Sequence, residues 1–288
     1  MDFSLEETHR LAVEALGHWA EAWGTVDAGT PWLSSDAVIA SLAEQGFLAM
    51  ARPDALGILG GVLLVEAVSR LPQASDIGVR GLIAPVLGIS VSDAPVAVVR
   101  AALHAPIRFL RPGGSLLVDA GDHVAWMEGA EIEPVESPFA YPFGRLTAPM
   151  ESKALEWIDL AAFRNLHGLA LGAEAVAAMQ ACLDLTLDHV RTRHQFGQPL
   201  GAFQAVQHRL AECATMLHGA RLLLYRAAAE EGDAVSLMLR YMREAIRRLI
   251  YESNQLHGAI GLTLEYPLHL WSYRLRWLQG EITERLTP

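Results

Sequence analysis

The chain of 288 residues has few lysines, few cysteines and a deficit of positive charge. Lys153 is its only lysine, so nearly all positive charge is arginine. The formal net charge of −11 argues against nucleic acid as a partner, because phosphate binding requires clustered cations. Cys182 and Cys213 lie in segments rich in alanine and leucine. We expect them to be two buried thiols in a reducing compartment rather than a disulfide.

Long apolar runs are also missing from the sequence. No stretch approaches about 18 uninterrupted apolar residues, so we expect no membrane span. The acidic start, MDFSLEETHR, lacks the apolar core of a signal peptide. Both features predict a cytoplasmic protein. What the chain does contain is 52% hydrophobic and 19% charged residues, which is typical of packed globular proteins, and its length is comfortable for two domains.

The pattern of apolar and turn residues divides the chain into three regions. Residues 1–103 have apolar positions at helical spacing, which predicts an N-terminal helical domain. Residues 104–150 have short apolar runs split by glycine and proline. The segments SLLVDA, HVAWME and EIEPVE predict short strands there, in a reduced middle β domain. This insert of about 45 residues is barely long enough for four to six strands.

Residues 151–288 are predicted to form a C-terminal four-helix bundle. Four blocks have apolar residues at i, i+3 and i+4 and are joined by short turns, which favours antiparallel packing. These blocks span residues 160–192, 203–231, 234–257 and 266–286. The predicted fold class is therefore mainly α.

Two ordered motifs, about sixty residues apart, lie at turns of this last region. The first reads R-x-x-F-G and then F-Q-x-x-Q, beginning at Arg193 and ending at Gln207. The second begins at Gln255 and reads Q-x-x-G-x-x-G, followed by E-x-P-L. Together they resemble the acyl-CoA dehydrogenase family, with Ala259 in place of that family's second glycine. The order of helices, shortened β insert and four-helix bundle resembles the same family.

The resemblance implies that both turns bind the ADP half of FAD, mainly the FAD of a neighbouring subunit. The residues to which it points are Arg193, Gln195, Phe196, Gln204, Gln255, His257, Gly258 and Ala259. The physical chemistry agrees, because a guanidinium fork and free N–H groups at a helix start both suit a pyrophosphate. The alternative is a plain connecting turn with exposed arginines, in which Gly258 is an ordinary helix C-cap.

Other parts of that family's site have no counterpart in the sequence. The T-E-P-x-x-G-S-D segment that holds the flavin ring is absent from residues 104–150, and we expect Trp126 to fill a small core. Where the family places its catalytic glutamate, this chain has Gln279 and Gly280, and a glutamine cannot accept the α-proton. The sequence therefore predicts a subunit without a complete flavin pocket and without a convincing base.

Three further residues lie near the family's two base positions. Glu281 follows Gly280 directly, and we expect it to be a surface residue of a solvated terminal helix. His167 lies near the alternative base position and is expected to be a packed histidine. Glu174 is too close to the first motif to match that position. The histidines show no metal-ligand spacing, so we predict no metal site.

Three hypotheses follow. In the first, the chain is a truncated subunit of a heteromeric acyl-CoA dehydrogenase, two plus two with a full-length partner subunit that supplies the base and most of the acyl-CoA site. Similar paired subunits are associated with bacterial breakdown of steroid side chains, so a steroid side-chain CoA ester is a candidate substrate. In the second, the chain is a self-sufficient homo-oligomeric acyl-CoA dehydrogenase with Glu281 as its base. In the third, it is a non-catalytic helical scaffold that binds no flavin.

Overall fold

The N-terminal region consists of short helices around one apolar helix. The computed structural model describes residues 5–24, 29–100, 105–129, 131–148, 151–230 and 233–287. In the first region the elements are α1 (Glu7–Ala20), η1 (Glu21–Trp23), β1 (Leu33–Ser34), α2 (Asp36–Glu44), η2 (Phe47–Ala49), α3 (Gly57–Ser69), β2 (Gln73–Ala74), the π-helical turn η3 (Val79–Ile83) and α4 (Ala84–Leu87). Most of α3 is buried, because apolar residues and glycine occupy all of its faces.

Seven strands follow and form two small sheets. They are β3 (Val96–Arg100), β4 (Ile107–Arg108), β5 (Ser115–Asp119), β6 (Val124–Glu128), β7 (Ile132–Val135), β8 (Phe143–Leu146) and β9 (Glu151–Ala154). One sheet has the order β3-β5-β6-β9 and the other β4-β8-β7. The only parallel pair in the described parts of these sheets is β3 with β5, where Val96 lies opposite Ser115.

The three predicted strands are confirmed as β5, β6 and β7. The expectation that residues 1–103 are wholly helical is wrong, because β3 lies within them. Its sequence, VAVVR, is rich in β-branched residues, which favour a strand over a helix. The strand β9 likewise extends the sheet beyond residue 150. The limits of the three domains stay a prediction.

The C-terminal four-helix bundle is confirmed. Its elements are α5 (Leu160–Thr192), β10 (His194–Gln195), β11 (Gln198–Pro199), η4 (Leu200–Ala202), α6 (Gln204–Ala229), α7 (Ala234–His257), η5 (Gly258–Leu262) and α8 (His269–Leu286). The Asp159 side chain accepts from the Ala162 N–H at 2.7 Å and so caps the start of α5. The predicted blocks differ from these helices by at most three residues at either end.

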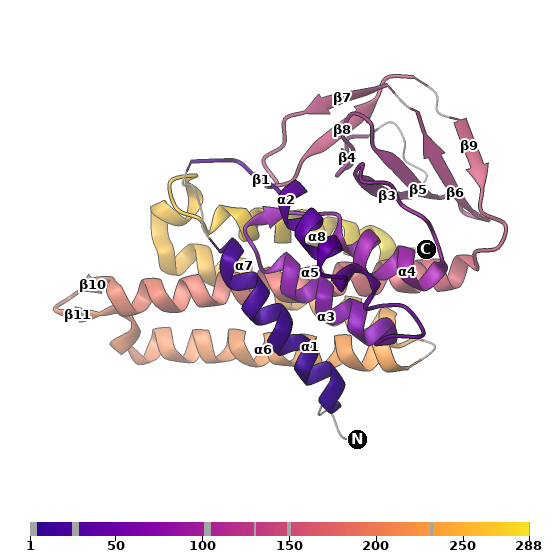
Figure 1. Ribbon diagram of the computed structural model, residues 1–288. Helices are drawn as coiled ribbons and strands as arrows, with labels where there is room; N and C mark the ends of the chain where they lie inside the picture. Colours follow the sequence, from indigo (N-terminus) through magenta and orange to yellow (C-terminus); the bar gives the residue numbers. More distant parts are fainter. Residues whose placement is uncertain are drawn as a thin grey trace.

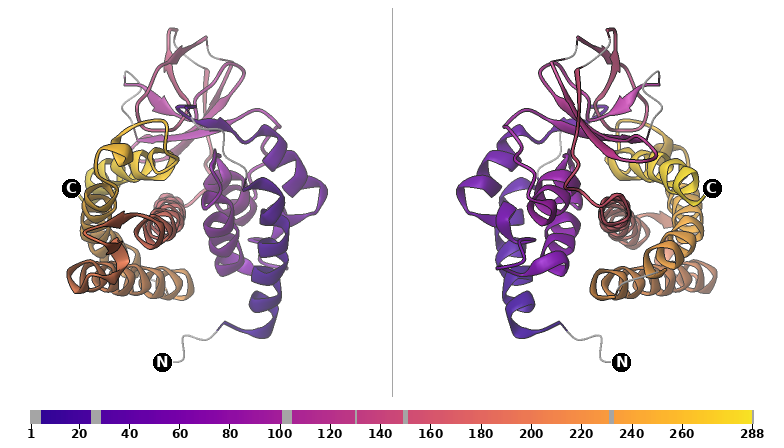
Figure 2. Two further views of the ribbon diagram at one scale, coloured as in Figure 1. Left: turned by 90° about the vertical axis from the view of Figure 1, so that its left-hand side faces the viewer. Right: turned by 90° about the vertical axis from the view of Figure 1, so that its right-hand side faces the viewer.

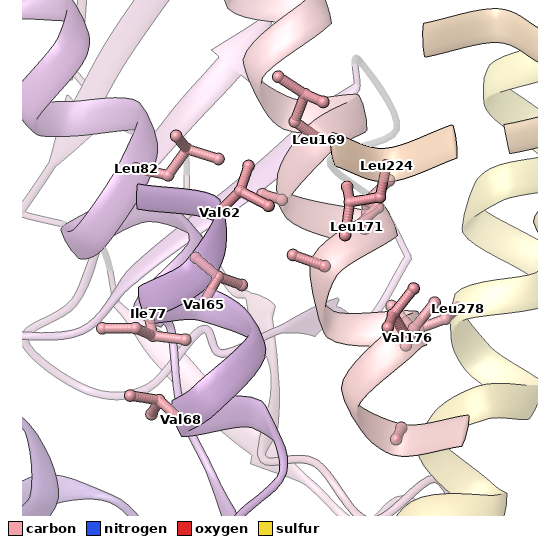
Figure 3. Close-up of a cluster of buried hydrophobic side chains, with 14 of the residues drawn as sticks. Val62, Val65, Val68, Ile77, Leu82, Leu169, Leu171, Val176, Leu224 and Leu278 are labelled. Carbon is pink, nitrogen blue, oxygen red and sulfur yellow. The ribbon is translucent and has the colours of Figure 1, made fainter. Parts of the chain in front are cut away.

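The helix α5 lies at the centre of the molecule and packs against helices on both sides. Figure 2 shows it between the N-terminal helices on one side and the remaining helices of the bundle on the other, with the sheets beside them. Figure 3 shows Val62 and Val65 of α3 in one apolar cluster with Leu171 of α5 and Leu278 of α8. By length and composition α5 could cross a membrane, but 83% of its most apolar window is buried inside the protein. It is therefore a core helix.

Both cysteines lie in this core. Cys182 and Cys213 are free and buried, as the sequence predicted. Burial raises the pKa of the Cys182 thiol strongly and that of Cys213 to about 11. Both thiols are therefore protonated at neutral pH and act as small apolar side chains.

Two glycines provide a matched test of packing. A Cβ atom at Gly144 of β8 would lie 2.4 Å from the Leu110 carbonyl oxygen, whereas one at Gly280 of α8 would meet nothing within 4 Å. We expect Gly144→Ala to lower the free energy of unfolding by about 1–3 kcal/mol, because backbone cannot move aside cheaply. We expect Gly280→Ala to raise it by up to about 1 kcal/mol through helix propensity. Urea unfolding followed by circular dichroism measures both, and equal effects would contradict this packing.

Candidate functional site

The first motif forms a hairpin at one end of the bundle, where α5 ends and α6 begins (Figure 1). Strands β10 and β11 pair antiparallel, with His194 opposite Pro199. At the tip, Phe196 and Gly197 have φ angles of 54° and 82°. A two-residue hairpin turn requires such left-handed residues, and glycine adopts this conformation without strain. Phe196 is 89% exposed, so this turn presents a large apolar ring to whatever binds there.

Polar donors surround this hairpin. Arg193, Gln195 and Gln204 are all exposed. The ion pairs of the described residues do not include Arg193, whereas Arg191 pairs with Asp188 at 3.2 Å. No side chain caps the N-terminus of α6, so its first N–H groups keep their capacity to donate to a ligand. The end of the bundle therefore offers both of the donors that a pyrophosphate needs.

The second motif lies at the end of α7. Gln255, Gly258 and Ala259 are exposed. Gly258 has a φ of 66°, and a Cβ atom built there would meet nothing within 4 Å. The backbone at this turn is therefore left-handed and open, which allows close approach of a ligand.

His257, at the second motif, contacts the end of α5 next to the first motif through a ring stack. It is buried, and its Nδ1 lies 2.8 Å from the Ser253 carbonyl oxygen. Its ring stacks on that of His189, with the centroids 4.4 Å apart. Because His189 is one turn before Arg193 on α5, this stack holds both motifs at the same end of the molecule. His257 thus supports the turn, and its predicted contact with a cofactor stays a prediction.

These residues fit the phosphate half of FAD. Arg193 supplies an exposed guanidinium fork without an acidic partner in the described parts of the chain, and α6 supplies an uncapped helix start. The open turn at Gly258 lies at the same end. The structure thus places Arg193, the start of α6 and the turn at Gly258 at the same end of the molecule.

A second cluster of charged side chains lies where the sheets meet α5 and α8. Its centre is Arg108 of β4, whose side chain is 11% exposed. Arg108 Nη1 donates to both carboxylate oxygens of Glu174, at 2.9 and 2.7 Å. Its Nη2 lies 3.1 Å from Glu281 Oε2, and the Tyr141 hydroxyl donates to Glu174 at 2.6 Å. Burial would lower the pKa of Arg108, but the two carboxylates raise it overall, so the guanidinium stays charged.

The expectation that Glu281 is a solvated surface residue is wrong. Its side chain is 19% exposed, because the sheets cover this face of α8. Trp277 Nε1 donates to it at 3.1 Å, and His167 Nε2 lies 3.5 Å away. Burial would raise the pKa of Glu281, but Arg108, His167 and Trp277 outweigh burial and lower it to about 2. Such a carboxylate is ionised at neutral pH and is a weak general base.

His167 and Glu281 face a cleft between the sheets, α5 and α8, which we call the β–α8 cleft. Its volume is about 390 Å³, and its walls include Val98, Ile107, Phe139, Leu171 and Trp277. His167 is largely but not fully buried, with its side chain 14% exposed, and burial lowers its pKa. It is therefore a neutral, packed histidine at pH 7, as the sequence predicted, although it also lines this cleft.

Sequence reasoning missed Arg108, Tyr141 and the role of Glu174. One signal was available, since Arg108 interrupts the apolar run PIRFL, and a charged residue in such a strand needs a buried partner. A second signal exists only in the structure. Phe109 and Ala140, which adjoin Arg108 and Tyr141, have φ angles of 64° and 57°. Non-glycine residues are strained in this conformation, and such strain is common at functional sites.

The buried pair of Arg108 and Glu281 predicts a specific pH dependence. The folded pKa of Glu281 is about 2, below its ordinary value of 4.5. Its ionised form therefore stabilises the fold above pH 4.5, and this contribution is lost as the pH falls towards 2. We expect Glu281→Gln to lower the free energy of unfolding by about 1–3 kcal/mol at pH 7. This deficit shrinks as the pH falls from about 4.5 to about 2.

Urea unfolding of both proteins at several pH values measures this deficit. Glu284→Gln, an exposed substitution one turn nearer the C-terminus, is the matched control and should have little effect at any pH. A deficit for Glu281→Gln that did not change with pH would contradict the ion pair.

Comparisons with known proteins identify the family that this chain resembles. The family model described as the acyl-CoA dehydrogenase C-terminal domain matches residues 164–280. Acyl-CoA dehydrogenase IpdE2 of Mycolicibacterium smegmatis is 26% identical over 252 residues, which are 81% of this chain and 79% of that protein. IpdE2 of Mycobacterium tuberculosis is 31% identical over 238 residues, which are 81% of this chain and 64% of that protein. The chain thus spans just under two thirds of the second relative.

Solved structures match along nearly the whole chain. The ChsE4–ChsE5 complex from Mycobacterium tuberculosis contains a chain with a TM-score of 0.72 and 19% identity, and the match covers 99% of this chain and 97% of that one. A variant of the Tcur3481–Tcur3483 steroid acyl-CoA dehydrogenase gives a TM-score of 0.71 and 22% identity, with 97% and 95% covered. At these identities the likeness shows the fold. The family model and the two IpdE2 relatives show that the chain belongs to the acyl-CoA dehydrogenase family.

Proposed function

We propose that this chain is the FAD-clamping subunit of a heteromeric acyl-CoA dehydrogenase that introduces an α,β double bond into an acyl-CoA. The two motifs at the end of the bundle hold the phosphate half of an FAD whose ring lies in a full-length partner subunit. That partner supplies the general base and most of the acyl-CoA site.

The observation that carries the proposal is the separation of two sites along α5. Arg193 follows the last residue of this helix, whereas His167 lies near its start in the wall of the β–α8 cleft. Arg193 comes 26 residues after His167, a separation of roughly 40 Å at the rise of an α-helix. An FAD bound by its phosphates at the hairpin cannot reach the cleft of the same chain with its ring. The end of the bundle is therefore suited to an FAD that belongs to another subunit.

The low pKa of Glu281 supports the proposal that the partner subunit supplies the general base. The carboxylate that abstracts the α-proton should have a pKa near the working pH. Glu281 is paired with Arg108, and its pKa is about 2. A base supplied by the partner removes this conflict.

Each clamping residue has a definite part in this proposal. FAD, when bound, accepts the β-hydride of the substrate. Arg193 neutralises phosphate charge, Gln204 and the start of α6 donate further hydrogen bonds, and the exposed Gln255 and Gly258 line the turn beside them. Phe196 offers its exposed ring as an apolar contact.

The relatives support a heteromer and suggest a substrate class. The two solved matches are named as a ChsE4–ChsE5 complex and as a steroid acyl-CoA dehydrogenase formed from Tcur3481 and Tcur3483. We infer by analogy a complex of two plus two subunits and a bulky, steroid-derived acyl-CoA as the substrate.

One observation favours a second candidate. Glu281 and His167 both face the β–α8 cleft rather than the surface. If substrate binding displaced Arg108, Glu281 would become a stronger base, and the chain would be a self-sufficient dehydrogenase.

The flavin clamp can be tested at Arg193. We expect Arg193→Ala to lower the amount of FAD that co-purifies with the complex by about tenfold or more, because a charge-assisted contact to phosphate is lost. Absorbance of the released flavin per protein measures this. Arg191→Ala is the matched control, because Arg191 is exposed two residues away and already paired with Asp188. Unchanged flavin content in Arg193→Ala would show that the assigned site is wrong.

The role of Glu281 separates the candidates. If the partner supplies the base, the complex with Glu281→Gln should keep its acyl-CoA dehydrogenase activity within about twofold, whereas a self-sufficient enzyme should lose at least about a hundredfold. Purification of the chain alone and together with the partner subunit adds a second measurement. The heteromer predicts yellow protein only in co-purified samples, with about one FAD per pair of chains. Protein that is colourless in both samples would favour the scaffold hypothesis.

A further inference from the structure

The β–α8 cleft has the size and walls of a small-molecule site. Its volume of about 390 Å³ lies in the range of ligand pockets. Trp277 and Phe139 form a continuous aromatic wall, with ring centroids 5.3 Å apart. Val98 and Leu171 are further apolar lining residues. The apolar surface suits the hydrocarbon body of a ligand.

Two of the carboxylates that line this cleft already have cationic partners. Asp119 accepts from Arg164 Nε and Nη2, each at 2.7 Å. Glu281 pairs with Arg108. These acids therefore contribute little negative charge to the space beside them, and Glu284 on the rim is the remaining acid among the described lining residues.

Three further arginines that line the cleft have no carboxylate within 4.0 Å among the described residues. They are Arg100, Arg276 and Arg285. Arg100 donates weakly to the Glu284 carbonyl oxygen at 3.4 Å. The exposed Arg276 guanidinium lies over the Tyr273 ring at 5.6 Å. The cleft thus has an excess of cationic groups whose donors are largely unused.

Arg285 is the most enclosed of the three. A Cβ atom at Gly168 would lie only 3.2 Å from Arg285 Nε, so the small residue leaves room for this side chain. Its Nη1 lies 3.5 Å from Nδ1 of the largely buried His167.

Burial lowers the pKa of Arg285 to about 10. Arg164 and Arg100 act in the same direction, whereas Asp119 and Glu281 raise the pKa but do not outweigh burial. Arg285 therefore stays charged at neutral pH, and an anion beside it would offset the cost of its burial.

From the aromatic wall and the unpaired arginines together, we propose that the β–α8 cleft binds a small carboxylate with an apolar body. The carboxylate lies at Arg285 and the apolar body lies against Trp277 and Phe139. This site is distinct from the flavin clamp at the other end of α5, and the inference does not rest on the proposed function.

The probe for this site is 3-phenylpropanoate, compared with its neutral amide, 3-phenylpropanamide. Isothermal titration with the full chain, in complex with its partner where one co-purifies, should show saturable binding of the acid. The amide should bind at least about tenfold more weakly, because it lacks the charge-assisted contact. Absence of binding by the acid at millimolar concentration, or equal binding of acid and amide, would overturn the proposal.

Three variants locate the binding. Arg285→Gln should weaken binding of the acid by about tenfold or more. Gly280→Met should weaken it at least as much, because a Cβ atom at Gly280 enters open space and the longer side chain extends into the cleft. Arg240→Gln removes an exposed arginine of α7 and should leave binding unchanged. Circular dichroism checks the fold. If folded Arg285→Gln or Gly280→Met protein bound the acid as well as the wild type does, the proposal would be overturned. Both variants should retain FAD, which would show that the cleft and the flavin clamp are separate sites.

Discussion

The cleft depends on one buried guanidinium, that of Arg108. It joins a strand, the central helix and the last helix, since it belongs to β4 and pairs with Glu174 of α5 and Glu281 of α8. Removal of either acid would leave Arg108 with a single carboxylate partner in a largely buried place, which is destabilising. The same contact sets the chemistry of the cleft. It keeps Glu281 ionised. Although this carboxylate lines the β–α8 cleft, its low pKa makes it a poor acceptor of protons.

The length of α5 then divides the molecule into two functional ends. His167, in the first part of the helix, lines the cleft. The last turn of the helix leads into the hairpin of β10 and β11 (Figure 1). The helix is buried along most of its length, so it cannot bend to bring the two ends together without loss of core packing. The hairpin and the cleft thus lie at opposite ends of a single rigid helix, and this geometry supports the proposed pairing of subunits.

Sequence reasoning predicted those parts of the molecule that local patterns determine. Apolar spacing located α5 to α8 within three residues, and the R-x-x-F-G motif located a hairpin whose Gly197 must be left-handed. It failed where distant segments meet. Arg108, Glu174 and Glu281 lie far apart in sequence, and the burial of Glu281 depends on sheets that cover one face of α8. No periodicity within α8 could indicate which side would be covered.

Arginine supplies the positive charge at both ends of α5, because the chain has a single lysine. A buried lysine can lose its proton and become neutral, whereas an arginine keeps its charge and needs an anion. Arg108 pairs with two carboxylates, those of Glu174 and Glu281, and Arg164 pairs with Asp119. Arg193 at the hairpin and Arg285 in the cleft have no such partner among the described residues. Water solvates the exposed guanidinium of Arg193, and a bound phosphate would replace this water. Arg285 is more enclosed, and the nearby acids Asp119 and Glu281 do not outweigh the effect of its burial on its pKa. An external anion would therefore stabilise Arg285 more than the exposed Arg193.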